Sequence, residues 1–177
     1  AGDVINSWGD PDVVPNDVHG CSFDEDDNIW VGGNGDAIVQ GYSHDGELLL
    51  QIGTRGVFDT TDGTEEGTFT NRSSERLYTP SGAVVDPASG NIFISDGYGN
   101  KRVAVFDRQG NFVRQWGSQA TAAERAASTP GTFTNVVHCI AISNAGLVYV
   151  CDRQGSRVQV FDTMGNHVRD IHVARTD

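Results

Sequence analysis

The sequence lacks the features of several large functional classes. No apolar run in the 177 residues approaches the roughly 20 that a membrane-spanning helix needs, so no membrane span is predicted. Only 12 Lys and Arg are scattered among 24 Asp and Glu, and the net charge is −12. A nucleic-acid partner is therefore not expected, because binding phosphates requires clustered positive charge. Nucleophile-elbow (GxSxG), P-loop (GxxxxGK[ST]) and dinucleotide (GxGxxG opening a helix) motifs are missing as well.

Cysteine is scarce. The three cysteines, Cys21, Cys139 and Cys151, show no CxxC spacing, so neither a zinc finger nor a thioredoxin-like site is indicated. Cys139 and Cys151 fall on neighbouring predicted strands, where a disulfide is one interpretation. Small buried thiols that fill strand positions are the favoured one. The chain begins with Ala-Gly-Asp rather than Met, which indicates a processed or cut start, and a secreted or periplasmic location is expected.

What the sequence does contain is one pattern written three times. Residues 91–117 hold short alternations of apolar and polar residues separated by turn signals such as Gln109-Gly110-Asn111. Alternation with period two is typical of strands, and 22 glycines favour many turns. Each repeat is predicted to be a four-stranded antiparallel unit. The units are 17–53 (strands 18–23, 28–32, 37–43 and 48–53), 80–117 (strands 82–86, 92–95, 102–106 and 112–116) and 137–173 (strands 138–143, 147–151, 157–161 and 167–173).

Two long loops, 54–79 and 118–136, connect the units and are candidate lids around a site, because loops of this length usually carry function. Each contains the sequence GTFTN, and residues 119–127 are predicted to form a short surface helix. Residues 3–9 end in Ser-Trp-Gly, as 115–117 end in Gln-Trp-Gly, and are predicted to be an isolated final strand.

Four-stranded repeats of this period predict an all-β fold, a β-propeller, with residues 1–177 forming one partial propeller domain. A closed ring needs about four blades or more. Three units alone would leave two apolar faces exposed, which soluble monomers rarely tolerate. We therefore expect the chain to need further blades or a second copy of itself to close the ring.

The sequences SDGYGNKRVAVFDRQGNFVRQWG and CDRQGSRVQVFDTMGNHV resemble the blades of NHL-repeat propellers. More narrowly, VHGCSFDEDDNIWV (18–31), SDGYGNKR (95–102) and FTNVVHCIAIS (133–143), followed by CDRQGSR (151–157), resemble blades of peptidyl-α-hydroxyglycine α-amidating lyase. The resemblance implies a six-bladed parent propeller that holds zinc in its central channel through three histidines from different blades. It also implies cleavage of a peptidyl-hydroxyglycine into a peptide amide and glyoxylate.

The resemblance carries over residue by residue. His19 and His138 match two of the zinc histidines, Tyr98 matches the catalytic tyrosine, and Arg153 matches one of the arginines. The third histidine and the other arginine of the family lie outside this chain. The family's cysteine directly after the tyrosine is Gly99 here.

The repeat itself supports a shared site. His19 and His138 begin the innermost strands of their units, with Ser81 at the equivalent place, and inner strands of a propeller line its channel. Neutral imidazoles from different blades could thus meet one zinc ion, which catalytic sites bind through three protein ligands. The alternative is a pair of channel histidines without metal. Tyr98 would act as a general base for a substrate hydroxyl, or else cap the blade edge.

Arg153 would hold a substrate carboxylate through paired hydrogen bonds, or else form a structural ion pair with Asp in its turn. Asp96 and Asp152 occupy equivalent turns and are expected to cap backbone N–H groups. Residues 24–28 have the spacing of a calcium loop, but a turn with solvated acids is favoured over calcium. The acids Asp59, Asp62, Glu65 and Glu66 are expected to be solvated, and His44, His167 and His172 to lie on the surface.

Two functions follow as hypotheses. One is a metal-dependent lyase that cleaves a carbon–nitrogen bond in a small peptide substrate and uses zinc at His19 and His138. The other is a non-catalytic NHL module that binds a peptide, glycan or protein partner. A third interpretation is a structural fragment without activity of its own.

Overall fold

The computed structural model describes residues 2–4 and 6–174. Within these residues the chain forms three four-stranded antiparallel sheets, called blades here. Blade 1 comprises β1 (Val18–Phe23), β2 (Ile29–Gly33), β3 (Ile38–Tyr42) and β4 (Leu48–Ile52). Blade 2 comprises β5 (Pro80–Val85), β6 (Ile92–Asp96), β7 (Arg102–Phe106) and β8 (Phe112–Trp116). Blade 3 comprises β11 (Val137–Ile142), β12 (Leu147–Asp152), β13 (Arg157–Asp162) and β14 (His167–His172).

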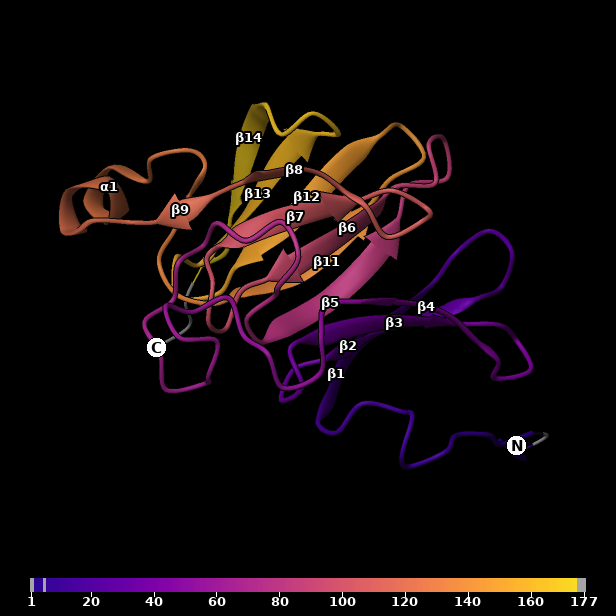
Figure 1. Cartoon of the computed structure of the whole chain (residues 1–177). Coiled ribbons are helices and arrows are strands. Elements are labelled where there is room, and N and C mark those ends of the chain that lie inside the picture. The colour runs from indigo at the N-terminus through magenta and orange to yellow at the C-terminus, as the bar shows by residue number, and fades with distance from the viewer. Residues whose placement is uncertain (1, 5, 175–177) are drawn as a thin grey trace.

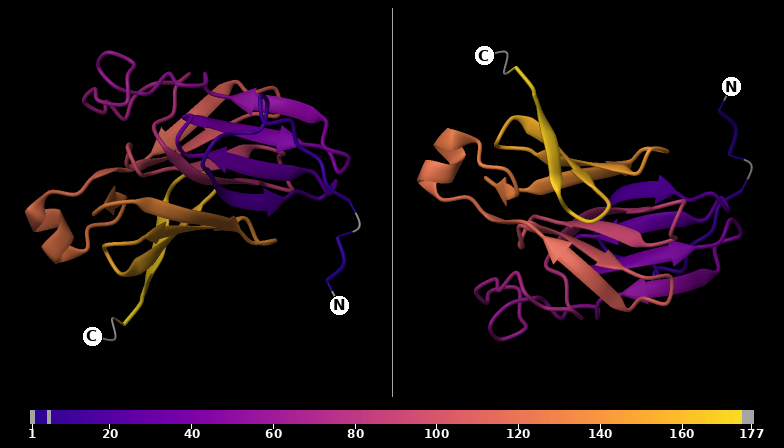
Figure 2. Two further views of the ribbon diagram at one scale, coloured as in Figure 1. Left: turned by 90° about the horizontal axis from the view of Figure 1, so that it is seen from below. Right: turned by 90° about the horizontal axis from the view of Figure 1, so that it is seen from above.

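In each blade the strands pair in sequence order, so every blade is a simple meander. Blade 2 lies between the other two (Figures 1 and 2). One apolar cluster, which includes Trp30 and Ile94, fills the space between blades 1 and 2, and a second, which includes Phe93 and Phe161, fills the space between blades 2 and 3. Alternation along the strands of blade 2 therefore sends side chains into both clusters. The strand bounds agree with the predicted ones to within two residues.

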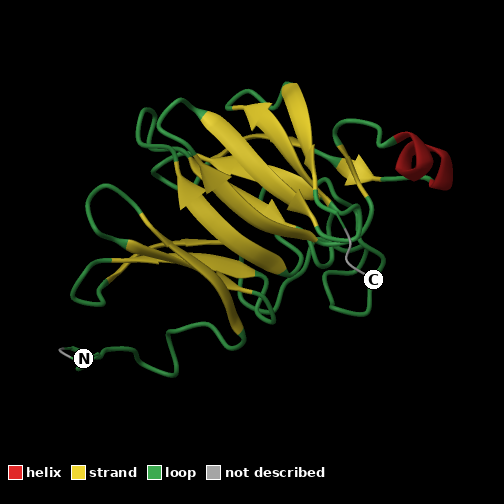
Figure 3. Cartoon of the chain, turned by 180° about the vertical axis from the view of Figure 1, so that it is seen from behind, coloured by secondary structure: helices red, strands yellow, loops and turns green. Residues whose placement is uncertain are grey.

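The connection between blades 2 and 3 holds a parallel pair, β9 (Ser118–Gln119) and β10 (Thr132–Phe133), and the helix α1 (Ala122–Ala127). The helix is the predicted surface helix: none of its residues is buried, and it projects away from the sheets (Figure 3). Thr121 and Glu124 form a capping box at its start, which satisfies backbone N–H groups that a helix of this length leaves without partners. Among the described residues, no helix is long and apolar enough to cross a membrane.

Adjacent blades lock together at the turn between the third and fourth strands. This turn carries a glycine with positive φ in each blade: Gly46, Gly110 and Gly165. An apolar side chain from the preceding segment of chain lies against each of them: Trp8 on Gly46, Leu50 on Gly110 and Trp116 on Gly165. A Cβ at Gly46 or Gly165 would stand 2.5 or 2.8 Å from the indole ring, so a glycine is needed for the contact as well as for the backbone conformation.

The outer face of blade 1 is covered by the segment that precedes it. Tyr42 stacks against Trp8, and Gln40 donates to the carbonyl of Val13 at 3.1 Å. Ile38, Gln40 and Tyr42 are consequently 2% exposed or less. The prediction of a strand at 3–9 was wrong: its described residues form no strand, because no neighbouring strand is available to pair with them. Trp8 nevertheless packs as its counterpart Trp116 does.

Buried ion pairs stabilise the turns between the second and third strands of blades 2 and 3. Arg102 pairs with Asp96 at 2.9 Å, and Arg157 pairs with Asp152 at 3.1 Å, with every side chain 2% exposed or less. The two carboxylates also accept backbone N–H groups, from Tyr78 and Thr134, as predicted for equivalent turn residues.

The acidic loop at 59–66 departs from the prediction of a solvated loop at one residue. Asp59 is only 2% exposed. It lies 3.4 Å from the Arg102 guanidinium and accepts the Asn100 amide at 3.0 Å. A buried arginine requires acceptors, and this carboxylate supplies one of them. His167 also departs from the expected surface position, since it is half-buried and hydrogen-bonded to Asp170.

Candidate functional site

The first strands of the three blades carry the centre of the site, and each of them bulges at the residue expected to face the channel. In β1 the register shifts between Val18 and Cys21, in β5 between Pro80 and Gly82, and in β11 between Val137 and Ile140. The irregular positions hold His19, Ser81 and His138. A β-bulge leaves its extra residue unpaired and re-aims the side chain. The repeated bulges thus turn equivalent residues of three blades toward one point.

Ser81 joins the two outer blades through the middle one. Its hydroxyl lies 2.7 Å from the carbonyl oxygen of Val137 in blade 3, and its own carbonyl oxygen lies 2.8 Å from Nδ1 of His19 in blade 1. Ser81 is 1% exposed. The serine in place of a third histidine is therefore a connector between the strands that carry His19 and His138.

The contact with Ser81 sets the tautomer of His19. A carbonyl oxygen only accepts hydrogen bonds, so Nδ1 donates, and Nε2 of the neutral ring is left as an acceptor. The hydroxyl of Tyr98 lies 3.1 Å from this Nε2 and donates to it. A ring nitrogen fixed in this way by a backbone carbonyl is the usual orienting contact of metal-binding histidines.

The second histidine completes an aromatic cluster. The ring of His138 lies 5.2 Å from that of His19 and 5.8 Å from that of Tyr98, both measured between centroids and in edge-to-face arrangement. Burial lowers the pKa of His138 below its ordinary value of 6.5, and the nearby His19 and Arg153 lower it further. His138 is therefore neutral at pH 7, the form in which imidazole binds metals.

Arg153 reaches the same cluster from the turn between β12 and β13. Its Nη1 lies 3.4 Å from the hydroxyl of Tyr98, and the side chain is exposed. The structural ion pair expected as the alternative for Arg153 is made by Arg157 instead. The structure thus brings together His19, Tyr98, His138 and Arg153, all four predicted site residues, and leaves the arginine free of the buried turn network.

Open space adjoins the cluster on both sides of His138. A pocket of about 220 Å³ is lined by residues of the three first strands, among them His19, Ser81 and His138. A second pocket, of about 380 Å³, is lined by His138, Arg153 and Val173 among others. A ligand could therefore approach both histidines and the arginine from the channel side.

The donor set fits part of a zinc site. His138 is in its neutral form, and Nε2 of His19 is an acceptor that the Tyr98 hydroxyl occupies, so His19 becomes a second imidazole ligand once that hydroxyl turns away. No group of three or more His, Cys, Asp and Glu side chains in the described part of the chain is placed to hold a metal ion. The third histidine that the resemblance implies is therefore not supplied by these residues.

Cys139 and Cys151 form a disulfide, with Cα atoms 5.0 Å apart. The favoured interpretation of two buried thiols was wrong, since Cys139 is exposed and Cys151 only half-buried. Because β11 bulges at His138 and Cys139, both of these residues oppose the single residue Cys151 of β12. The covalent bond thus ties the bulge of His138 to the strand that leads into Arg153. Cys21 is a free, exposed thiol.

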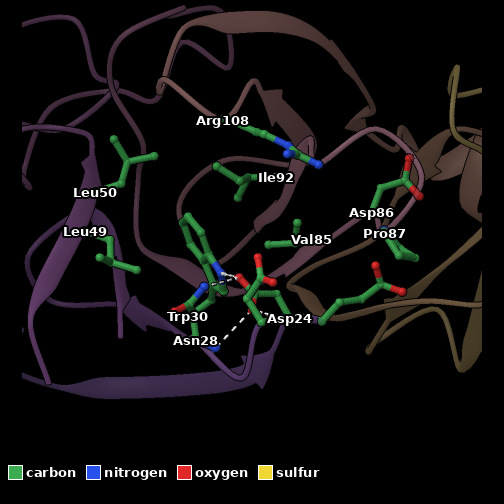
Figure 4. A pocket seen from close by; sticks show the side chains of 13 residues that line it. Asp24, Asn28, Trp30, Leu49, Leu50, Val85, Asp86, Pro87, Ile92 and Arg108 are labelled. Atoms are coloured by element: carbon green, nitrogen blue, oxygen red, sulfur yellow. Dashed lines mark hydrogen bonds between the residues drawn. The ribbon is translucent and has the colours of Figure 1, made fainter. Parts of the chain in front are cut away.

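The loop of residues 24–28, predicted to be a turn rather than a calcium site, follows β1 and so lies at the opposite end of that strand from His19. Asp24 and Asn28 of this loop are drawn in Figure 4. Asp24 accepts the indole N–H of Trp30 at 2.9 Å and the backbone N–H of Asn28 at 3.0 Å, so its carboxylate closes the turn. Asp107 and Asp162 close the turns between the third and fourth strands of blades 2 and 3 in the same way. A pocket of about 230 Å³ opens here between blades 1 and 2, with apolar walls, acids on one side and Arg108 on the other.

Comparison with known proteins agrees with this architecture. A model of the NHL repeat family matches residues 77–106 and 134–161. Virginiamycin B lyase from Staphylococcus aureus superposes with a TM-score of 0.55 at 9% identity, over 89% of this chain and 42% of that one, which shows a shared fold alone. The chain therefore has a β-propeller fold with three blades present, and blades 2 and 3 contain NHL repeats.

Its sequence further resembles the peptide-amidating enzymes. Peptidylglycine alpha-amidating monooxygenase of Rattus norvegicus is 32% identical over 151 residues, which make up 82% of this chain and 14% of that protein. Peptidyl-alpha-hydroxyglycine alpha-amidating lyase 1 of Drosophila melanogaster is 27% identical over 150 residues, 81% of this chain and 25% of that protein. The chain thus spans a quarter or less of the length of these relatives.

Proposed function

We propose that the chain contributes the channel site of a zinc-dependent peptidyl-α-hydroxyglycine amidating lyase. The observation that carries the proposal is the convergence of His19, Tyr98, His138 and Arg153, from all three blades, on one cluster. These residues match the family's site positions, and relatives of this chain are named for the same activity. A propeller that only binds a partner does not require this convergence.

The substrate has a carboxylate and a hydroxyl on the same carbon, and the site offers a partner for each. The exposed guanidinium of Arg153 is suited to hold the carboxylate through two parallel N–H···O bonds. Tyr98, whose hydroxyl oxygen lies 3.4 Å from Nη1 of Arg153, would take the substrate hydroxyl proton as a phenolate, after its own proton has left. The electron pair left on oxygen forms the carbonyl of glyoxylate, the carbon–nitrogen bond breaks, and the departing amide nitrogen takes up a proton.

In this proposal His19 and His138 hold zinc through the nitrogens that face the channel. When bound, the metal ion would act as a Lewis acid on the substrate hydroxyl. The third ligand would come from a further blade of a six-bladed parent or from a second copy of the chain. Exposed apolar side chains on β14 and directly after it support such a completion: Val168 is 51% exposed, Ile171 37% and, beyond the strand, Val173 57%.

The proposal includes a secreted or periplasmic location. The disulfide between Cys139 and Cys151 supports it, because disulfides persist in oxidising compartments and are rare in the cytosol. Mass measurement in solution tests the completion of the ring: a 19.0 kDa monomer that binds zinc stoichiometrically would contradict the need for an outside ligand.

Release of glyoxylate from an N-acyl-α-hydroxyglycine, with zinc added and after chelation, tests the activity. We expect Tyr98→Phe to lower kcat on the order of 10²- to 10⁴-fold, the usual effect of losing a general base. Arg153→Met should mainly raise KM. Matched controls are Tyr149→Phe and Arg108→Met, which change the same residue types away from the channel and should leave kcat and KM unchanged.

Absence of glyoxylate release by the unaltered, zinc-loaded protein in its completed ring would refute the lyase proposal. Binding of a peptide, glycan or protein that survives both chelation and His138→Ala would instead support the non-catalytic module.

A further inference from the structure

Lys101, the single lysine of the chain, is almost fully buried beside the candidate site. It ends the turn between β6 and β7 that carries Tyr98, and it is 5% exposed. Its ammonium lies 3.4, 3.1, 3.0 and 3.0 Å from the backbone carbonyl oxygens of Gly97, Tyr98, Gly99 and Asn100. An ammonium has three N–H groups, so it shares them among these four acceptors. The backbone of the turn thus surrounds the ammonium of Lys101, its last residue.

The equivalent turns of the other blades have no such cation. Residues 34–37 connect β2 to β3, and residues 153–156 connect β12 to β13, so each has four residues, whereas residues 97–101 make five. The short turns end on Ala37 and Ser156, both with positive φ, whereas none of residues 97–101 has positive φ. The blade fold therefore needs neither the extra residue nor the lysine. Both occur in the blade that presents Tyr98.

The rest of the turn is held just as closely. The amides of Tyr98 and Gly99 donate to the carbonyls of Thr79 and Tyr78, so the N–H groups face one side of the turn and the carbonyls face Lys101. A Cβ at Gly97 would lie 2.1 Å from the carbonyl oxygen of Val137, and one at Gly99 would lie 2.2 Å from the Tyr78 ring. The turn is thus clamped between the strand that carries His138 and the segment that precedes blade 2.

The positive charge of the Lys101 ammonium offsets the partial negative charges of the four carbonyl oxygens around it. Burial lowers the pKa of Lys101, while the charge of Asp96 opposes that effect. The phenyl ring of Phe69 lies 5.7 Å from the ammonium and adds a further favourable contact. Without the ammonium, the four carbonyl oxygens would converge on a space with no donor, and like partial charges repel. We expect the turn then to open and carry Tyr98 with it.

We propose that Lys101 is a positioning residue: its ammonium shapes the turn so that the hydroxyl of Tyr98 lies between His19 and Arg153. The effect on the turn follows from the contacts of the turn alone. The effect on activity rests on the proposed lyase function.

Hydrogen exchange of single amides tests the effect on the turn. In Lys101→Met, which keeps the side-chain stem and removes the ammonium, the amides of residues 98–100 should exchange at least 10-fold faster. The amides of Arg153 and Gln154, which make similar bonds in blade 3, should be unchanged and serve as the internal control. Unchanged exchange at 98–100 in a folded Lys101→Met protein would overturn the proposal.

A second variant separates the donors from the charge. Lys101→Ala should show the same fast exchange, and added propylammonium, which replaces the missing atoms, should slow it again. Tetramethylammonium carries the same charge without N–H groups and should have no effect. Should Lys101→Met fail to fold, Lys101→Ala prepared with propylammonium decides, and equal exchange with either cation would overturn the role of the donors.

Kinetics tests the consequence for Tyr98. Lys101→Met should lower kcat about 10- to 100-fold with little change in KM. In a Tyr98→Phe background it should lower kcat no further, because both substitutions disable the same function, that of the Tyr98 hydroxyl. Additive losses would contradict positioning through Tyr98. Zinc affinity should stay unchanged, because His19 is oriented by Ser81. If the unaltered protein releases no glyoxylate, the lyase function fails while the exchange result still decides the role of Lys101.

Discussion

Replacing Cys139 and Cys151 with serine removes the covalent link between β11 and β12. The disulfide joins residues at a sequence separation of 12, and closing a loop of this size in the unfolded chain accounts for about 3 kcal/mol of stability. For a chain of this length, that loss corresponds to a fall in Tm of roughly 6–12 °C. Since the link fastens the bulge that carries His138, we also expect weaker zinc binding by the double variant.

Thermal unfolding with and without a thiol reductant measures the effect. The reductant should lower the Tm of the unaltered protein to that of Cys139→Ser/Cys151→Ser and leave the Tm of the double variant unchanged. Cys21→Ser is the matched control, because Cys21 is a free thiol, and it should behave as the unaltered protein. Equal Tm values for oxidised, reduced and doubly substituted protein would refute the reasoning.

Three further predictions concern the turns around the site. Arg157→Met should lower the free energy of unfolding, measured with denaturant, by about 3–5 kcal/mol, because it leaves the buried Asp152 carboxylate without its partner. Arg153→Met should change the same free energy by less than about 0.5 kcal/mol, because Arg153 is exposed. An NMR titration of His138 should give a midpoint below 6.5. The unfolded chain then takes up this proton at higher pH than the folded chain, so stability should fall as pH decreases from 6.5 toward the lowered pKa. Gly99→Ala should cost about 1–3 kcal/mol in denaturant unfolding, because the new methyl group would overlap the Tyr78 ring.

Each of these predictions has a contrary result. Equal losses for the two arginine variants would show that the network around Arg157 is not tightly coupled. A midpoint for His138 at or above 6.5 would contradict its desolvation in the cluster. A neutral Gly99→Ala would mean that the Tyr78 ring can move aside.

The strands and the meeting of the site residues were predictable because both depend on local repetition. Alternation with period two and a glycine in each turn define a strand pair without information from distant residues. His19 and His138 occupy equivalent places in their repeats, so the geometry that points one of them into the channel also points the other. Their distance in sequence did not matter for this inference.

The errors arose where distant residues decide the outcome. The disulfide requires the register of β11 on β12, and the bulge shifts that register at the cysteine itself. Asp59 has the sequence neighbourhood of a solvated acid, but it is buried because Arg102 and Asn100 arrive from blade 2. The segment 3–9 has the pattern of a strand without a partner to pair with. Lys101 gave no signal at all, because its four acceptors are backbone atoms, which every sequence has.

The contacts of Trp8 with Gly46, of Leu50 with Gly110 and of Trp116 with Gly165 have a consequence for how such a protein can evolve. Each described blade receives one apolar side chain from the chain before it, and blades 1 and 2 each offer one to the blade after them. A repeat that keeps this receiving glycine and this donated side chain can be duplicated, deleted or exchanged with little change to the rest, because coupling reaches only to the adjacent repeat. The site residues lie at the other end of the strands, so the chemistry of the channel can diverge while the joints between repeats are preserved.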